Sequence, residues 1–113
     1  TVLHAMGYPL TYFHGIPHGQ ANGILFAAYL RYVHQIAPQK VGEVLVNLGL
    51  TSLNEFQQLM EDLFKDKRRA LKVDEEVLPA WAQRAAATKN AANSIGNPSP
   101  RAVEEIFRKS LLR

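Results

Sequence analysis

The sequence contains no cysteine among its 113 residues. Disulfide bridges, thiolate metal sites and cysteine nucleophiles are therefore excluded. The lack of cysteine fits a reducing compartment, and we expect a cytoplasmic protein. Because 47% of the residues are apolar, the chain can still build a small hydrophobic core, and its length predicts one domain.

Long apolar runs are lacking as well. The best one, GILFAAYL at residues 23–30, is stopped by Arg31 and is far shorter than the roughly 20 residues that a membrane-spanning helix needs. No signal peptide is visible, so we expect no membrane partner. The chain begins with Thr1 rather than methionine, and TVLHAMG is typical of the middle of an apolar helix, so we expect a piece of a longer protein.

An excess of one charge is found only in one short segment. The formal net charge is +3, and basic residues gather in KDKRRALK at residues 65–72. A nucleic-acid surface normally spreads basic residues along one face, together with aromatic residues or a recognised module. Neither is evident, so we expect a solvated segment between two helices and no nucleic-acid partner.

Strand patterns and repeats are also absent, and the spacing of apolar residues is helical nearly throughout. Gly7 and Pro9 predict the end of a first helix and a loop at residues 8–17. The SLNE pattern at residues 52–55 predicts a capping box at the start of a later helix. Further helices are expected over 17–37, from about 40 to 48, over 79–88 and from 100 onward, with a loop at 89–100. The apolar face after the capping box is Leu53, Phe56, Leu59, Met60 and Leu63. The predicted fold class is all-α, with five or six helices.

Three of the four histidines lie within residues 4–18, a stretch punctuated by glycine and proline. His18 follows Pro17 at the start of a predicted helix, where backbone amides are unpaired. Because the loop is long enough to fold back, His4 and His18 can meet in space, and neutral imidazole is a good ligand for a divalent metal ion. The same helix end could instead bind an anion such as phosphate.

Two histidines are fewer ligands than a catalytic metal commonly takes, which is three protein ligands and an open position. The sequence has no His-Glu-x-x-His motif and no Asp-x-x-x-His pair. A packing or hydrogen-bonding role therefore remains the alternative for each histidine. We expect His34 on the surface or in packing, and His14 could face the same cleft without binding metal.

Two segments of the sequence resemble the iron-dependent (group III) alcohol dehydrogenases. HAMGYPLTYFHGIPHGQANGIL, residues 4–25, is similar to the segment that carries the last two metal ligands of that family. The family pattern of a histidine, Pro-Leu, Gly-x-Pro-His-Gly and Ala-Asn is matched by His4 and by residues 9–10, 15–19 and 21–22. NPSPRAVEEIFRKSL, residues 97–111, resembles the close and final helix of the family.

The resemblance implies a two-domain enzyme. Its N-terminal α/β domain would bind NAD or NADP, and its C-terminal domain would be all-helical, as in the dehydroquinate synthase-like enzymes. A metal held by one Asp and three His would lie between them, and residues 1–113 would be the C-terminal metal-binding domain alone. His4 and His18 would be the last two ligands of Fe(II) or Zn(II), either of which suits such a ligand set. The resemblance assigns no catalytic residue within this chain and leaves the residues that bind the nucleotide open.

The activity that the resemblance implies is the oxidation of an alcohol, or the reduction of an aldehyde or ketone, with NAD(P) as the hydride carrier. Many family members have a second histidine four residues after the first of these two ligands. Tyr8 stands there in this chain, and its hydroxyl could hydrogen-bond in the cleft but is a poor proton exchanger at neutral pH. We expect Tyr8 and Phe13, with Tyr12 beside them, to contact a small alcohol or aldehyde. The 113-residue chain alone should be inactive.

Two alternatives remain open at this stage. A glycerol dehydrogenase, maleylacetate reductase or dehydroquinate synthase uses a related scaffold, although the Pro-His-Gly-Gln-Ala-Asn run at residues 17–22 favours the alcohol dehydrogenases. A helical interaction module without a metal would fit the length, the basic segment and the incomplete ligand set. Apolar surface left uncovered by a missing domain could also drive formation of a homodimer.

Overall fold

The computed structural model describes residues 2–92 and 94–112, and within these residues it contains helices and no strand. The elements are α1 (Val2–His14), α2 (His18–Ile36), α3 (Pro38–Asn47), α4 (Leu53–Ala70), η1 (Glu75–Val77), α5 (Leu78–Ala86), α6 (Lys89–Ala92) and α7 (Pro100–Leu111). η1 is a 3₁₀ turn and α6 has only four residues, so the prediction of an all-α fold with five or six helices of ordinary length is confirmed. Thr1, in the predicted first helix, and Asn93, in the predicted loop before α7, lie outside the described residues.

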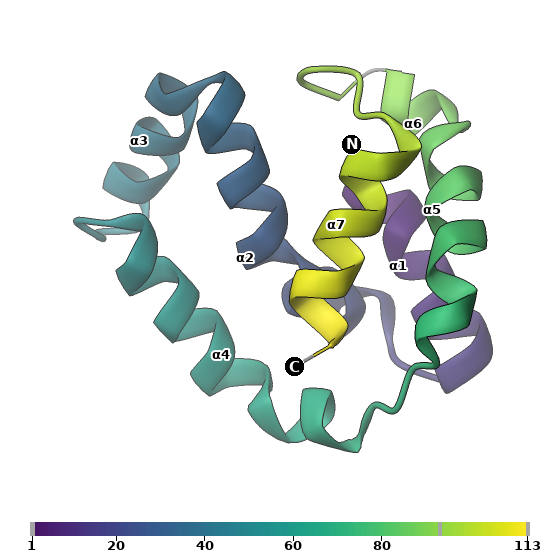
Figure 1. Ribbon diagram of the computed structural model, residues 1–113. Coiled ribbons are helices and arrows are strands. Elements are labelled where there is room, and N and C mark those ends of the chain that lie inside the picture. The colour runs from purple at the N-terminus through teal and green to yellow at the C-terminus, as the bar shows by residue number, and fades with distance from the viewer. Residues whose placement is uncertain (1, 93, 113) are drawn as a thin grey trace.

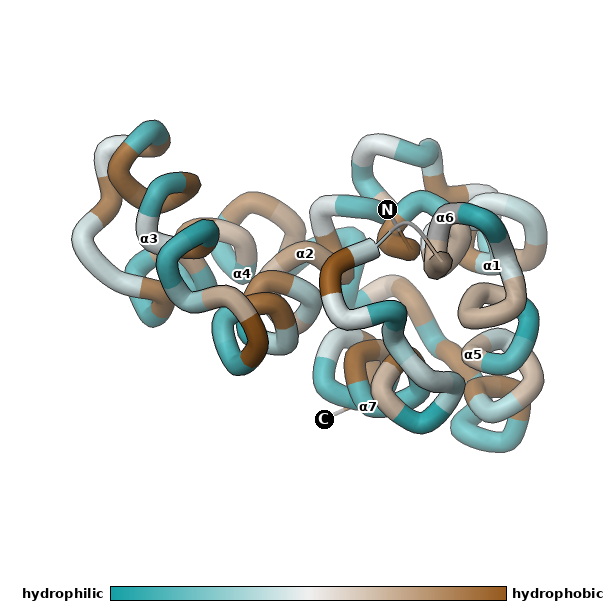
Figure 2. The backbone as a smooth tube through the Cα atoms, turned by 90° about the horizontal axis from the view of Figure 1, so that it is seen from above, coloured by the Kyte–Doolittle hydropathy of each residue, from teal (hydrophilic) through white to brown (hydrophobic). Residues whose placement is uncertain are grey.

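α2 is the central helix of the fold. It packs against α1 and α7 on one side and against α3 and α4 on the other (Figure 1). α5 packs on α7 and α1, so these three helices and part of α2 enclose most of the core. Seen from above, α3 and α4 lie to one side of α2, with α1, α5 and α7 on the other (Figure 2). No helix in the described part of the chain is long and apolar enough to cross a membrane.

The first helix is longer than the sequence suggests. α1 continues through Gly7 and Pro9 to His14, so the predicted loop at residues 8–17 is wrong. A proline inside a helix costs about 3 kcal/mol, since it removes a hydrogen bond and crowds the preceding turn. Met6 and Leu10, on either side of Pro9, have no exposed surface, and their burial offsets that cost.

α1 ends instead at Gly15. This glycine has a φ of +67°, a left-handed conformation that residues with a Cβ rarely adopt. Its N–H donates to the carbonyl of Thr11 at 3.0 Å, and the N–H of Ile16 donates to the carbonyl of Leu10 at 3.4 Å. Such bonds satisfy carbonyl groups at the end of the helix. Only residues 15–17 separate α1 from α2.

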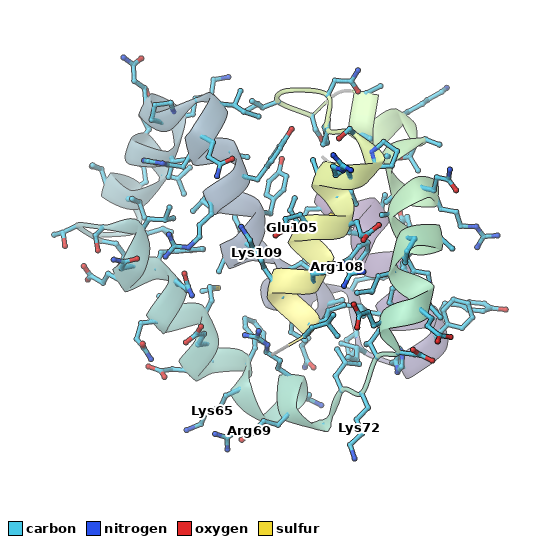
Figure 3. The ribbon with its side chains drawn as sticks, in the orientation of Figure 1. Lys65, Arg69, Lys72, Glu105, Arg108 and Lys109 are labelled. Carbon is cyan, nitrogen blue, oxygen red and sulfur yellow. The ribbon has the colours of Figure 1, made fainter. Side chains whose placement is uncertain are left out.

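The basic segment is helical rather than a linker. α4 runs to Ala70, so most of residues 65–72 form its last turns, and the prediction of an inter-helix segment there is wrong. Cations at a helix C-terminus interact favourably with the helix dipole, which explains why the helix continues. Lys65, Arg69 and Lys72 project outward at this end of the molecule (Figure 3).

The predicted capping box at the start of α4 is present. The Ser52 hydroxyl accepts from the Glu55 N–H at 3.1 Å, and the Glu55 carboxylate reaches back to the N–H and hydroxyl of Thr51. The predicted apolar face of α4 is only partly right, because Leu59 and Leu63 are exposed. The residues of α4 packed against the core are Leu53, Phe56, Met60 and Phe64. These recur at steps of three and four and form one stripe, which leaves Leu59 and Leu63 beside it.

The C-terminal helices begin as predicted. Asp74 accepts from the Glu76 N–H before α5, and Ser99 accepts from the Ala102 N–H at the start of α7. Trp81 of α5 is buried, as expected. Among the described residues of the predicted loop at 89–100, Lys89–Ala92 form the single turn α6, and Pro100 is the first residue of α7.

Candidate metal centre

One face of α1 carries three polar side chains at helical spacing. His4, Tyr8 and Thr11 follow one another at steps of four and three residues, which places them on the same face of a continuous helix. His4 and Tyr8 are exposed, and Thr11 is half-buried. The face exists only because α1 continues past Pro9.

His18, the first residue of α2, lies against this face. Its ring and the Tyr8 ring pack in a T-shaped arrangement, with centroids 5.3 Å apart and planes 81° from parallel. Its Nδ1 lies 3.3 Å from the Thr11 hydroxyl oxygen. The short turn at residues 15–17 therefore folds His18 back onto the helix face that also carries His4.

The donor chemistry of this corner suits a divalent transition metal, because imidazole nitrogen is a good ligand for zinc and iron. In the described part of the chain, hydrogen bonding engages the His18 ring only at Nδ1, so Nε2 is available to a ligand. No group of three or more His, Cys, Asp or Glu side chains that could hold a metal occurs within residues 2–92 and 94–112. The corner thus offers two imidazoles, and any further donors would come from elsewhere.

A groove of about 660 Å³ adjoins this corner between α1 and α5. Its walls include Tyr8, Pro9, Tyr12 and Phe13 from α1 and Trp81 and Arg84 from α5. The Phe13 and Trp81 rings stack, with centroids 5.9 Å apart and planes 5° from parallel. Tyr8 and Phe13 therefore line a single groove, and Tyr8 connects it to His18. Trp81 was predicted only as a core residue, because no local pattern shows that it lies opposite Phe13.

The remaining histidines make no ring contact or hydrogen bond with His18 in the described part of the chain. His14, the last residue of α1, is exposed and packs at an angle of 73° on the ring of Trp81, a wall of the groove, with ring centroids 6.1 Å apart. His34 is exposed near the end of α2, as expected.

The best-defined ion pairs are structural. Arg108 of α7 donates to Glu104 at 2.9 Å and also to Glu75 of η1, which ties these two elements together. The hydrogen bonds to Glu75 and Glu104 raise the pKa of Arg108 above its ordinary value. These residues belong to neither the histidine corner nor the groove.

Comparisons with known proteins give matches to one family, in sequence and in fold. The model of the Fe-containing alcohol dehydrogenase family, C-terminal part, matches residues 1–111. A solved structure of an iron-containing alcohol dehydrogenase from Thermotoga maritima is 29% identical in sequence and superposes with a TM-score of 0.75. That match covers 98% of this chain and 29% of the Thermotoga chain, so the present chain spans less than a third of the enzyme it resembles. No curated protein matches the sequence significantly.

Proposed function

We infer the function from the chain's family, because this chain belongs to the Fe-containing alcohol dehydrogenases and matches their C-terminal part. We propose that it is part of a metal-dependent, NAD(P)-linked enzyme that oxidises an alcohol or reduces an aldehyde or ketone. Within that enzyme, His4 and His18 would be two ligands of the catalytic metal. The observation that supports this most is the packing of His18 on Tyr8, on the helix face that also carries His4.

The metal in this proposal is Fe(II) or Zn(II), which when bound supplies a Lewis acid for the substrate oxygen. His4 and His18 would hold it through ring nitrogens. The other ligands and the groups that bind NAD or NADP would come from the rest of the enzyme, since the described residues contain no group of three or more side chains that could hold a metal.

The groove between α1 and α5 supports a role for Tyr8 and Phe13 in binding the substrate. Both line a largely apolar space that begins at Tyr8, where the His18 ring packs. Their rings would exclude water from a small alcohol or aldehyde, and the Tyr8 hydroxyl would offer it a hydrogen bond.

We further propose a cytoplasmic enzyme that forms a homodimer.

The direct test replaces the two histidines in the complete enzyme that contains this chain. We expect His4→Ala and His18→Ala each to remove most of the bound metal and the NAD(P)-linked alcohol oxidation. The loss should exceed the roughly 10–100-fold that removing an outer-shell partner of a metal ligand costs. His34→Ala, on an exposed histidine of α2, is the matched control and should retain both.

Metal content and activity that persist in both His4→Ala and His18→Ala would contradict the proposal. Alcohol oxidation by the isolated 113-residue chain would contradict it too, since two imidazoles without a nucleotide site should not support the reaction. A panel of alcohols, polyols and keto acids on the complete enzyme separates an alcohol dehydrogenase from a glycerol dehydrogenase or maleylacetate reductase on the same scaffold.

A further inference from the structure

Thr11 touches His18 although it belongs to the preceding helix. Its hydroxyl oxygen lies 3.3 Å from Nδ1 of the His18 ring, the nitrogen nearer the backbone. The contact depends on the unbroken α1, which carries Thr11 one turn beyond Tyr8, and on the three-residue turn that returns the chain. The proposed function assigns no role to the Thr11 hydroxyl.

We propose that Thr11 is a positioning residue for His18. The Thr11 hydroxyl accepts a hydrogen bond from Nδ1–H and so keeps the imidazole in the tautomer whose lone pair is on Nε2. A metal-binding histidine commonly donates its other ring N–H to such a partner, which fixes both tautomer and ring orientation. The inference rests on the proposed function in one respect, namely that Nε2 is the atom that would bind the metal.

Tyr8 provides the second restraint on the same ring. The edge contact between Tyr8 and His18 limits rotation of the imidazole about its bond to Cβ, while Thr11 fixes which nitrogen faces α1. His18 itself is exposed and stands at the first residue of its helix, so surrounding core packing does not restrain it. Two side chains three residues apart on α1 therefore hold a ring that would otherwise sample several rotamers.

The direction of the hydrogen bond decides the consequence. If the Thr11 hydroxyl donated to Nδ1 instead, the Nδ1 lone pair would accept that hydrogen bond and the ring proton would sit on Nε2. Nε2 would then have no lone pair to offer a metal. The two directions leave opposite tautomers, so the position of the proton on His18 in the metal-free chain tests the inference directly.

The experiment measures the histidine tautomers of the 113-residue chain by long-range ¹H–¹⁵N correlation spectra in mildly alkaline solution. His18 is assigned by the signal lost in His18→Gln. We expect His18 as the Nδ1–H tautomer in the unmodified chain and a shift toward Nε2–H, the form that imidazole side chains ordinarily favour, in Thr11→Val. Thr11→Ser keeps a hydroxyl and should restore the Nδ1–H form.

Two controls separate the hydroxyl from the packing. Tyr8→Phe keeps the aromatic ring against His18 and should leave the tautomer unchanged. His34 should show the ordinary tautomer in every variant. A mainly Nε2–H tautomer of His18 in the unmodified chain would overturn the inference, and so would an unchanged tautomer in a folded Thr11→Val.

The tautomer measurement uses neither metal nor substrate, so it can fail or succeed independently of the proposed function. In the complete enzyme, Thr11→Val should weaken metal binding by roughly 10–100-fold, less than His18→Ala. If the His18→Ala enzyme kept its metal while the His18 tautomer changed in Thr11→Val, the contact between Thr11 and His18 would be supported and the proposed function would be contradicted. If the Thr11→Val enzyme bound metal as tightly as the unmodified one, the positioning role would be contradicted.

Discussion

Single polar side chains fix the starts of several helices. Ser52 and Ser99 each accept a hydrogen bond from the backbone N–H three residues on, and Asp74 accepts from the N–H two residues on. Each satisfies a backbone donor that the helix itself leaves unpaired. Because cap and recipient are neighbours in the chain, this level of the structure can be predicted from the sequence.

The cap of α4 makes stability depend on pH through Glu55. Hydrogen bonds from the side chain and backbone of Thr51 lower the pKa of Glu55 below its ordinary value. A carboxyl with a lowered pKa in the folded state stabilises the fold at neutral pH, and the contribution is lost as the pH falls through that pKa. We expect Glu55→Gln to lower the melting temperature at pH 7 and the difference from the unmodified chain to shrink in acid.

Thermal unfolding between pH 7 and pH 3 measures this difference. Glu43→Gln, at an exposed glutamate of α3, is the control and should show no such convergence in acid. A Glu55→Gln deficit of constant size across the range would show that the carboxylate hydrogen bonds do not contribute.

At the scale of helices, close approach depends on particular glycines. A Cβ at Gly23 of α2 would overlap the ring of Phe64 of α4, whereas a Cβ at Gly42 of α3 would meet nothing. We expect Gly23→Ala to destabilise the fold by about 1–3 kcal/mol, because the ring must move in a packed interface. Gly42→Ala should stabilise it by about 1 kcal/mol, since alanine favours a helix over glycine. Urea denaturation compares the pair, and a gain from Gly23→Ala would show that the α2–α4 interface is loosely packed.

Local signals explain which helices could be predicted and which could not. α2, α5 and α7 were placed closely because each follows or contains a proline at its first turn. The sequence predicts too short a first helix, because Gly7 and Pro9 are residues at which helices ordinarily end. In the fold Gly7 instead admits the approach of Asn22 from α2, a Cβ there lying 2.7 Å from Asn22 Oδ1. Such a contact between helices leaves no trace in the spacing of residues.

The sequence predicts which residues form the candidate site, an assignment that stays a prediction, but it does not predict their geometry. His4 and His18 stood out by motif, and Tyr8 by its distance of four residues from His4. The support of His18 by Thr11 and the stacking of Phe13 on Trp81 join different helices, so only the folded chain reveals them. The error in α1 mattered here, because a loop at residues 8–17 would have separated Thr11 from the helix face.

At the scale of the whole molecule, a buried hydrogen bond joins segments at opposite ends of the chain. The Val2 N–H at the start of α1 donates to the Ser94 hydroxyl at 2.6 Å, and both residues are buried. We expect Ser94→Ala to cost about 1–3 kcal/mol, because it leaves a buried donor unsatisfied. The buried Ser110 hydroxyl has no hydrogen-bond partner within the described residues, so Ser110→Ala should be nearly neutral.

Chemical denaturation of the two serine variants measures this difference. Both changes remove one hydroxyl from a buried serine, so they differ mainly in whether a partner is lost. Equal losses of stability would indicate that the contact between Val2 and Ser94 does not hold the start of α1 against the segment before α7.

The central claim is that the imidazoles of His4 and His18 share one metal ion. Anomalous diffraction from crystals of the complete, metal-loaded enzyme tests it most directly. The account predicts one anomalous peak about 2.0–2.2 Å from a ring nitrogen of each histidine. The bonded atom of His18 should be Nε2, and its Nδ1–H should still donate a hydrogen bond to the Thr11 hydroxyl. A metal bound elsewhere, with the rings of His4 and His18 both outside its coordination shell, would contradict it.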